Sequence, residues 1–195
     1  MTASLGPQDD AGTELTEEER QGLIPSYITL RSELNEAEQA NILEAEAWAF
    51  ARKRDVLAEQ FINNLHKRMY SNVWRWAGQH RTSDKNIGID AYRIPTEFRQ
   101  LLDDCRYSIE NNTYEPDEIA ARFHHKLVSI HLYPNGNGRH ARLATDLLLK
   151  SMSRERFSWG SRNLVDAGQT RERYIDALQA ADKHDFGPLL EFVRS

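Results

Sequence analysis

The chain has 195 residues, of which 39% are hydrophobic and 28% are charged, a balance typical of one soluble globular domain. Its formal net charge of -5 argues against a broad nucleic-acid-binding face, which requires excess basic residues. A single cysteine, Cys105, excludes an internal disulfide and is expected to be a buried, inert thiol. The first residues lack the pattern of a secretory signal, and no apolar run is long enough to span a bilayer, so we expect a cytoplasmic protein.

The N-terminal part of the sequence is polar and acidic. Residues 1–34 are therefore expected to form a tail with a candidate inhibitory segment, and residues 35–195 to form one domain. Within the tail, Thr16 and Glu19 have the spacing of a capping box for a single helical turn.

The first long helix is expected over residues 35–54. Asn35 and Glu38 have the three-residue spacing of a helix cap, and the apolar residues that follow recur at helical intervals. Its expected buried face consists of Leu43, Ala47 and Phe50, widened by Ile42, Ala45 and Ala49.

A second helix is expected over residues 55–70, followed by a segment without helical period. The apolar stripe of this helix consists of Leu57, Phe61, Leu65 and Met69. In the segment SNVWRWAGQHRTSDKNIGIDAYRIP, Gly78 and Gly88 interrupt the chain, and Ile87, Ile89 and Ile94 predict a short strand or hairpin. The expected hairpin residues are Ile87, Gly88, Ile89 and Ile94.

The remaining chain reads as helices separated by short breaks. One helix is expected from Pro95, and Pro116 stands at a natural first position for another that ends near His131. A third is expected from about Gly138 to Met152, and a final pair restarts at Gly187. The sequence therefore predicts an all-α domain with one small β-hairpin.

The break HLYPNGNGRHAR has the chemistry of a polyphosphate site. Gly136 and Gly138 permit unusual backbone angles and close approach of a ligand to the main chain. The loop leads into a helix N-terminus, whose unpaired N–H groups attract anions. Arg139 and Arg142 are three residues apart, so both lie on one side of the first helical turn.

His131 begins this loop and offers a neutral imidazole, which is suited to act as a general base. A base beside a polyphosphate site suggests transfer of a phosphate-containing group to a hydroxyl. The stretch contains no GxxxxGK[ST] and is not a P-loop. The structural alternative is a Gly-Asn-Gly turn with solvated arginines.

The same stretch resembles the motif of the Fic family, His-x-Phe-x-(Asp/Glu)-Gly-Asn-Gly-Arg-x-x-Arg. VWRWAGQHRTSDKNIG is similar to the Fic segment that precedes the flap, and RYIDALQAADKHDFGPLLEFV is similar to the closing helices. GLIPSYITLRSELNEAEQANI further resembles the bacterial subgroup called mobile mystery protein B. Fic proteins generally move AMP from ATP to a protein hydroxyl and release pyrophosphate.

The resemblance implies a role for each motif residue. His131 would deprotonate a Ser, Thr or Tyr hydroxyl of the target. The main chain of Gly136, Asn137 and Gly138 would hold the inner phosphates, and Arg139 and Arg142 would bind the outer ones. The hairpin at residues 87–94 would be the flap, which pairs with the target as an added strand. Tyr174 would lie where the closing helices approach the nucleotide.

Two positions depart from the family motif. Tyr133 replaces phenylalanine and is expected to be a core anchor whose hydroxyl needs a partner. Asn135 replaces the Asp or Glu that usually holds Mg²⁺; its amide oxygen can ligate this cation but brings no charge.

Many Fic proteins carry an inhibitory helix, (Ser/Thr)-x-x-x-Glu-(Gly/Asn), whose glutamate pairs with the second motif arginine. Two registers fit in part, Thr29 with Glu33 and Ser32 with Glu36, although neither glutamate is followed by Gly or Asn. The resemblance makes Glu36 or Glu33 a candidate partner of Arg142. Ordinary helix capping is an equal alternative.

Several functional hypotheses remain open. The leading one is Mg²⁺-assisted adenylylation of a protein target, with self-modification and control by an antitoxin or other regulatory partner as candidates. The others are a non-catalytic nucleotide-binding module and transfer of another phosphate-linked group. Trp74 and Trp76 are expected in the core rather than in a base-stacking surface.

Overall fold

The protein is described here by a computed structural model, which defines residues 21–161 and 167–195. Its helices are α2 (Arg31–Phe50), α3 (Glu59–Tyr70), α4 (Ile94–Asn111), α5 (Pro116–Ile130), α6 (Asn137–Ser151), α7 (Ala167–Asp182) and α8 (Gly187–Arg194). A short 3₁₀ helix, η2 (Ala91–Arg93), precedes α4. The all-α prediction is confirmed. The capping turn expected at Thr16 and Glu19 lies outside the described residues.

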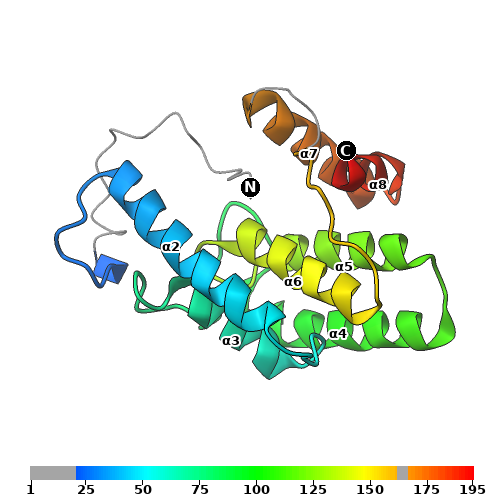
Figure 1. Ribbon diagram of the computed structural model, residues 1–195, viewed down its shortest axis with the longest axis horizontal. Coiled ribbons are helices and arrows are strands. Elements are labelled where there is room, and N and C mark those ends of the chain that lie inside the picture. The colour runs from blue at the N-terminus through cyan, green and yellow to red at the C-terminus, as the bar shows by residue number, and fades with distance from the viewer. Residues whose placement is uncertain (1–20, 162–166) are drawn as a thin grey trace.

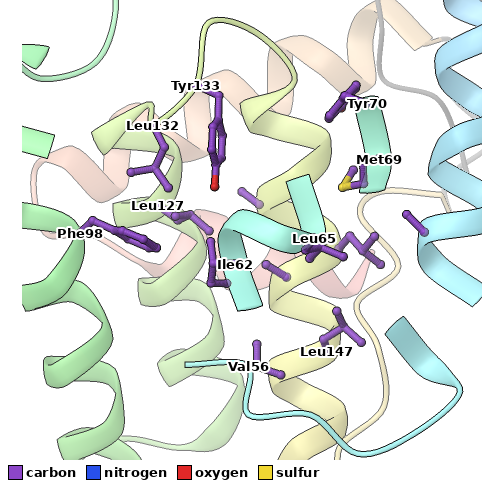
Figure 2. Packing of buried hydrophobic residues seen from close by; sticks show 14 of the residues in the cluster. Val56, Ile62, Leu65, Met69, Tyr70, Phe98, Leu127, Leu132, Tyr133 and Leu147 are labelled. Carbon is purple, nitrogen blue, oxygen red and sulfur yellow. The ribbon is translucent and has the colours of Figure 1, made fainter. Parts of the chain in front are cut away.

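The helices pack as neighbouring pairs, with α2 on α3, α4 on α5 and α5 on α6, while α7 and α8 pack on each other (Figure 1). The main core lies between α3, α4, α5 and α6, where α3 contributes Ile62, Leu65 and Met69, each fully buried (Figure 2). A second apolar cluster joins α7 and α8 to one face of α5. No helix in the described part of the chain combines the length and the apolar character needed to cross a lipid bilayer.

The helix expected from residue 35 begins at Arg31 and crosses the boundary expected at residue 34. Its start is fixed by Glu33, whose carboxylate accepts hydrogen bonds from the backbone N–H groups of Thr29 and Leu30. Residues 21–30 also pack on the domain, since the amide of Ile24 donates to Val73 and that of Arg75 donates to Gly22.

The buried face predicted for this helix was partly wrong. Leu43 is 51% exposed and Ala47 is also exposed, whereas Ala45 and Ala49 are buried as expected. The buried stripe consists of Leu34, Glu38, Asn41, Ala45 and Ala49. Glu38 belongs to the inward face because two polar side chains meet it there, and this contact forms part of the candidate site.

The hairpin expected over residues 87–94 is absent from the structure. Residues 86–89 form bends, residues 91–93 form η2, and Ile94 is the first residue of α4 and fully buried. The one β-bridge among the described residues joins Leu23 to Trp74. Ile94 is therefore a core residue rather than part of a flap.

The burial predicted for Cys105, Trp74 and Trp76 agrees with the structure. Cys105 is buried, and burial raises the pKa of its thiol to about 12, which makes it unreactive near neutral pH. Trp74 is buried and Trp76 packs partly buried against the same core, with the two rings stacked at 5.0 Å. Both tryptophans thus serve packing, as predicted.

Candidate active site

The loop between α5 and α6 is bounded by two residues with positive φ. His131 ends α5 in the left-handed conformation, with φ 57° and ψ 65°, a region that costs a non-glycine residue about 1 kcal/mol. Gly136 caps the start of α6 with φ 79°. A Cβ at Gly136 would lie 2.5 Å from the ring of Tyr70, so this position requires glycine for both conformation and space.

The interior of the loop is held by Asn137, whose side chain is buried. Its Oδ1 accepts a hydrogen bond from the amide of Tyr133 at 2.9 Å, and its Nδ2 donates to the Tyr133 carbonyl at 2.8 Å. These two bonds close the turn from both directions. The Asn137 side chain is thus structural, and only its main-chain N–H remains for a ligand.

Tyr133 anchors the loop in the core, as the sequence predicts. The ring is fully buried in the core (Figure 2). It stacks on His66 at 3.6 Å, and its hydroxyl donates to Asn63 at 2.7 Å. His66 Nδ1 accepts from the Gly78 amide, so its Nε2 carries the proton and donates to the Asn135 carbonyl at 3.1 Å. This chain of contacts ties the loop to α3.

The first turn of α6 presents an open anion site. The amides of Asn137, Gly138 and Arg139 have no intrahelical partner, because the first N–H groups of any helix lack one. A Cβ built on Gly138 would meet no atom within 4 Å, so the space beside it is empty of protein. A phosphate could therefore approach the main chain directly there.

The two motif arginines differ in their surroundings. Arg139 bonds to Glu38 of α2, with 2.5 Å between Nη2 and Oε2. Arg142, one turn further along α6, is partly buried and makes no hydrogen bond or ion pair with any described residue. Its guanidinium remains available to a ligand.

Glu38, rather than Glu33 or Glu36, contacts the motif. Its Oε1 accepts from the indole N–H of Trp74 at 2.6 Å while Oε2 bonds to Arg139, and its side chain is only 3% exposed. Glu33 is an exposed helix cap and Glu36 is exposed on α2. The candidate pairing of either residue with Arg142 is thus replaced by a Glu38–Arg139 pair. Sequence inspection could have found Glu38, because it lies on a helical stripe with Leu34 and Ala45.

Tyr174 of α7 lies close enough to Arg142 for the two side chains to interact electrostatically. Its hydroxyl is 2.8 Å from Nε2 of His124, which is fully buried in α5 and whose Nδ1 is 3.4 Å from the Thr145 hydroxyl. Burial raises the pKa of Tyr174 to about 12, although the charge of Arg142 opposes that rise. The phenol is therefore neutral, and its contact with His124 holds it beside Arg142.

The His131 imidazole is partly buried at the other end of the loop. Burial, with smaller effects from the charges of Arg81 and Lys85, lowers its pKa to about 4. The ring is therefore neutral at physiological pH, as a general base must be.

The segment 82–90 crosses directly over His131. Gly88 has φ 94°, and a Cβ there would lie 2.6 Å from the His131 Cβ. Ile87 is 63% exposed, while Ile89 is partly buried against the core. The segment thus lies beside His131 without forming strands.

Asn135 gives poor support for a protein-held metal. Its Oδ1 accepts a hydrogen bond from the Gly136 amide at 2.6 Å, so this neutral oxygen already has a partner. No cluster of three or more His, Cys, Asp or Glu side chains able to hold a metal occurs within residues 21–161 and 167–195. The side chains around Asn135 do not fit a magnesium cage, which favours carboxylates.

Comparisons with known proteins identify a family domain that contains this loop. The sequence model of the Fic/DOC family matches residues 56–149, which include α3, α4, α5, the whole loop and most of α6. Residues 56–149 are a Fic/DOC-family domain. Outside that match, α2 supplies Glu38 to the Fic loop.

Curated relatives carry the same domain in longer chains. The protein adenylyltransferase Fic of Aedes aegypti is 28% identical over 145 residues, 72% of this chain and 28% of the relative. The protein of the same name from Drosophila mojavensis is 33% identical over 136 residues, 68% of this chain and 26% of the relative. The chain thus spans about a quarter of the length of these relatives.

A solved structure supports the fold. The Fic domain of a VirB-translocated Bep effector protein from Bartonella quintana, with bound ADP, superposes with a TM-score of 0.67 at 16% identity. The match covers 86% of each chain. At this identity the likeness concerns the fold alone.

Proposed function

We propose that this Fic protein is an adenylyltransferase, which moves AMP from ATP to a Ser, Thr or Tyr hydroxyl of a protein. The observation that carries the proposal is one loop with a neutral imidazole at its start and an open helix N-terminus at its end, beside the available Arg142. A base and an anion site so arranged can act on a hydroxyl and a phosphate held together. The names of the curated relatives support the same activity.

In the proposed reaction, His131 accepts the proton of the target hydroxyl. The hydroxyl oxygen then bonds to the α-phosphorus of ATP, the bond from that phosphorus to the bridging oxygen breaks, and pyrophosphate leaves. The amides from Asn137 to Arg139 would face the charge that develops on the phosphate oxygens. A bound anionic nucleotide would also raise the pKa of His131 from about 4, which strengthens it as a base.

We propose that Mg²⁺ binds to this protein only together with the nucleotide. Asn135 offers one neutral oxygen that already accepts from Gly136, so the ATP phosphates rather than this chain would hold the ion. When bound, Mg²⁺ would neutralise phosphate charge. The roles of His131 and the α6 amides do not depend on this ion.

The Glu38–Arg139 pair suggests an autoinhibited resting state. An arginine whose guanidinium bonds to a buried carboxylate is a poorer partner for the outer phosphates of ATP, because both anions compete for the same N–H groups. ATP could bind through Arg142 and the α6 amides but with its phosphates displaced. We propose that Glu38, rather than Glu33 or Glu36, has the inhibitory role.

The target would meet the protein at the 82–90 segment, whose residues are mostly exposed and lie over His131. An extended target chain could form main-chain hydrogen bonds along this segment. The same proposal includes self-modification, a regulatory or antitoxin partner and membership of the mobile mystery protein B subgroup, which rest on the sequence resemblance. It also includes a cytoplasmic location, which rests on the sequence pattern of the first residues and on the short apolar runs.

One observation favours a second candidate function. Asn135 stands where the family motif carries a carboxylate, and its oxygen faces the neighbouring amide. If the nucleotide needs a protein carboxylate to be activated, the chain would bind nucleotide without transfer and act as a sensing module. Transfer of another phosphate-linked group is the third alternative.

Intact mass measurement after incubation with ATP distinguishes these functions. Adenylylation adds the mass of an AMP unit to the protein or to a co-purified target, a kinase-like transfer adds a phosphate, and a sensing module adds neither. The Glu38→Gln variant is measured in parallel so that restraint by Glu38 is not mistaken for inactivity. Nucleotide binding without any mass change in both forms would refute the transferase and leave the sensing module.

A further inference from the structure

Arg81 is a buried arginine outside the family motif. It precedes the 82–90 segment, and its side chain is 1% exposed. The nearest carboxylate, that of Asp84, is 4.0 Å from the guanidinium and 72% exposed, so it offers little compensation for the buried charge. A buried charge of this kind needs other partners.

Those partners are main-chain carbonyls on both sides of the site. Nε donates to the carbonyl of His131 at 2.7 Å, and Nη1 donates to that of Ser83 at 2.9 Å. Nη2 donates to the carbonyl of Ile130 at 3.3 Å and, through a shorter bond, to that of Ile89. One guanidinium therefore joins the end of α5 to both ends of the 82–90 segment.

The electrostatics explain why a cation is stable there. Ile130 and His131 contribute the last carbonyls of α5, where the helix dipole places partial negative charge. Only the planar fork of arginine can reach four carbonyls in different directions at once; a lysine ammonium has three donors at a single point.

We propose that Arg81 is a positioning residue for the transfer reaction, holding the His131 main chain in its left-handed conformation and the 82–90 segment across it. The direction of the imidazole depends on that main chain, because its Cβ is placed by φ and ψ. The surface for the target lies on the segment that the same guanidinium binds. Arg81 thus fixes the position of His131 relative to the 82–90 segment. The kinetic part of this inference rests on the proposed adenylyl transfer.

The variants are Arg81→Gln and Arg81→Lys, with Arg75→Gln as the matched control because Arg75 is exposed close by in sequence. Three quantities are measured on folded protein: ATP affinity, the rate of AMP transfer, and tryptic cleavage after Lys85. The pH titration of the His131 ring, followed by NMR, is a fourth.

For Arg81→Gln we expect cleavage after Lys85 to rise at least about tenfold, because proteolysis follows the population of the opened segment. Transfer should fall on the order of 10²-fold, the loss typical of a misplaced catalytic group, while ATP affinity stays within about twofold. The pKa of His131 should rise, since a neighbouring positive charge is removed. Arg81→Lys should give intermediate values, and Arg75→Gln should match the wild type.

A purely structural arginine would lower the melting temperature without changing transfer per folded molecule, and that result would overturn the proposal. If Arg81→Gln does not fold, Arg81→Lys decides: wild-type cleavage and transfer in that variant would also overturn it. Should the wild type transfer nothing, the proposed function fails, but an unchanged rate of cleavage after Lys85 would still overturn the positioning role of Arg81.

Discussion

Replacement of Glu38 by glutamine is expected to lower stability and raise nucleotide binding at the same time. The amide oxygen of glutamine can still accept from Trp74, but its N–H₂ group would face the donors of Arg139. Arg139 would therefore leave the pair and become available to phosphate.

The size of the stability loss follows from the burial of the pair. The carboxylate of Glu38 is 3% exposed, whereas the Arg139 side chain is 25% exposed and can turn to water. Removal of one partner from a fully buried pair costs about 3–5 kcal/mol, so the partly exposed arginine brings the expected cost to about 2 kcal/mol. For a domain of this size that corresponds to a melting temperature lower by about 4–8 °C.

Glu46→Gln is the matched control, because Glu46 lies on the same helix and its carboxylate bonds to Arg156 at 2.6 Å. That pair is more exposed and lies away from the loop, so its loss should cost less than about 1 kcal/mol. ATP affinity, measured by titration calorimetry, should rise on the order of tenfold in Glu38→Gln and stay unchanged in Glu46→Gln, and AMP transfer should rise only in the former. Equal affinities and rates in the two variants would refute the reasoning that Glu38 restrains Arg139.

Three further predictions concern the loop and the buried histidines. Gly138→Ala should keep or raise the melting temperature, because its Cβ meets open space in a helix, but it should weaken ATP binding. Gly136→Ala should instead destabilise the fold. Similar melting temperatures and similar calorimetric ATP affinities of the two variants would contradict the proposed phosphate site. Asn135→Asp should raise transfer and lower the Mg²⁺ concentration that it requires, because it adds a charged oxygen ligand; an unchanged magnesium titration would mean that this position does not face the metal. Burial lowers the pKa of His124 to about 3 and that of His140 to about 4, so the unfolded chain binds these protons near pH 6.5 while the folded chain does not. The free energy of unfolding should thus fall as pH drops from 6.5 toward 4, by about 1 kcal/mol per pH unit for each histidine; urea titrations with equal midpoints at pH 7.5 and 5 would refute this.

The features that local sequence determines were predictable. Pro116 marks the start of α5, and the Gly-Asn-Gly stretch marks the break before α6, because glycine and proline act through their own backbone angles. Tyr133 was recognised as an anchor because a buried phenol needs a hydrogen-bond partner.

The features that depend on tertiary contacts were not predicted from the sequence. The inward face of α2 contains Glu38 instead of Leu43, because Trp74 and Arg139, both far along the chain, meet the carboxylate there. A rule that places charges outside misses such a pair, although the helical spacing of Glu38 with Leu34 and Ala45 indicates an inward position. For the same reason, the contact with a motif arginine was predicted for Glu33 or Glu36, whereas Glu38 makes it.

The missing hairpin has a related cause. The segment 82–90 is held at its two ends by hydrogen bonds from Arg81 to main-chain carbonyls rather than by a strand ladder, so Ile87, Ile89 and Ile94 did not indicate strands. The four carbonyl partners of Arg81 are main-chain atoms, which carry no sequence signal. Only the fold brings them together.

The central claim is that His131 is the base for transfer of AMP. Asparagine is the cleaner replacement, because it tolerates the left-handed conformation of this residue better than alanine does. His184→Asn, an exposed histidine that also has positive φ, is the control.

The most direct measurement is incorporation of label from ATP carrying ³²P at the α- or the γ-phosphate, in the wild type and in His131→Asn, His131→Ala and His184→Asn. Our account predicts that only the α-label enters protein, that both His131 variants lose about 10²–10⁴-fold in rate while they still bind ATP, and that His184→Asn matches the wild type. Transfer of the γ-label, or α-label transfer that persists at the wild-type rate without His131, would contradict it.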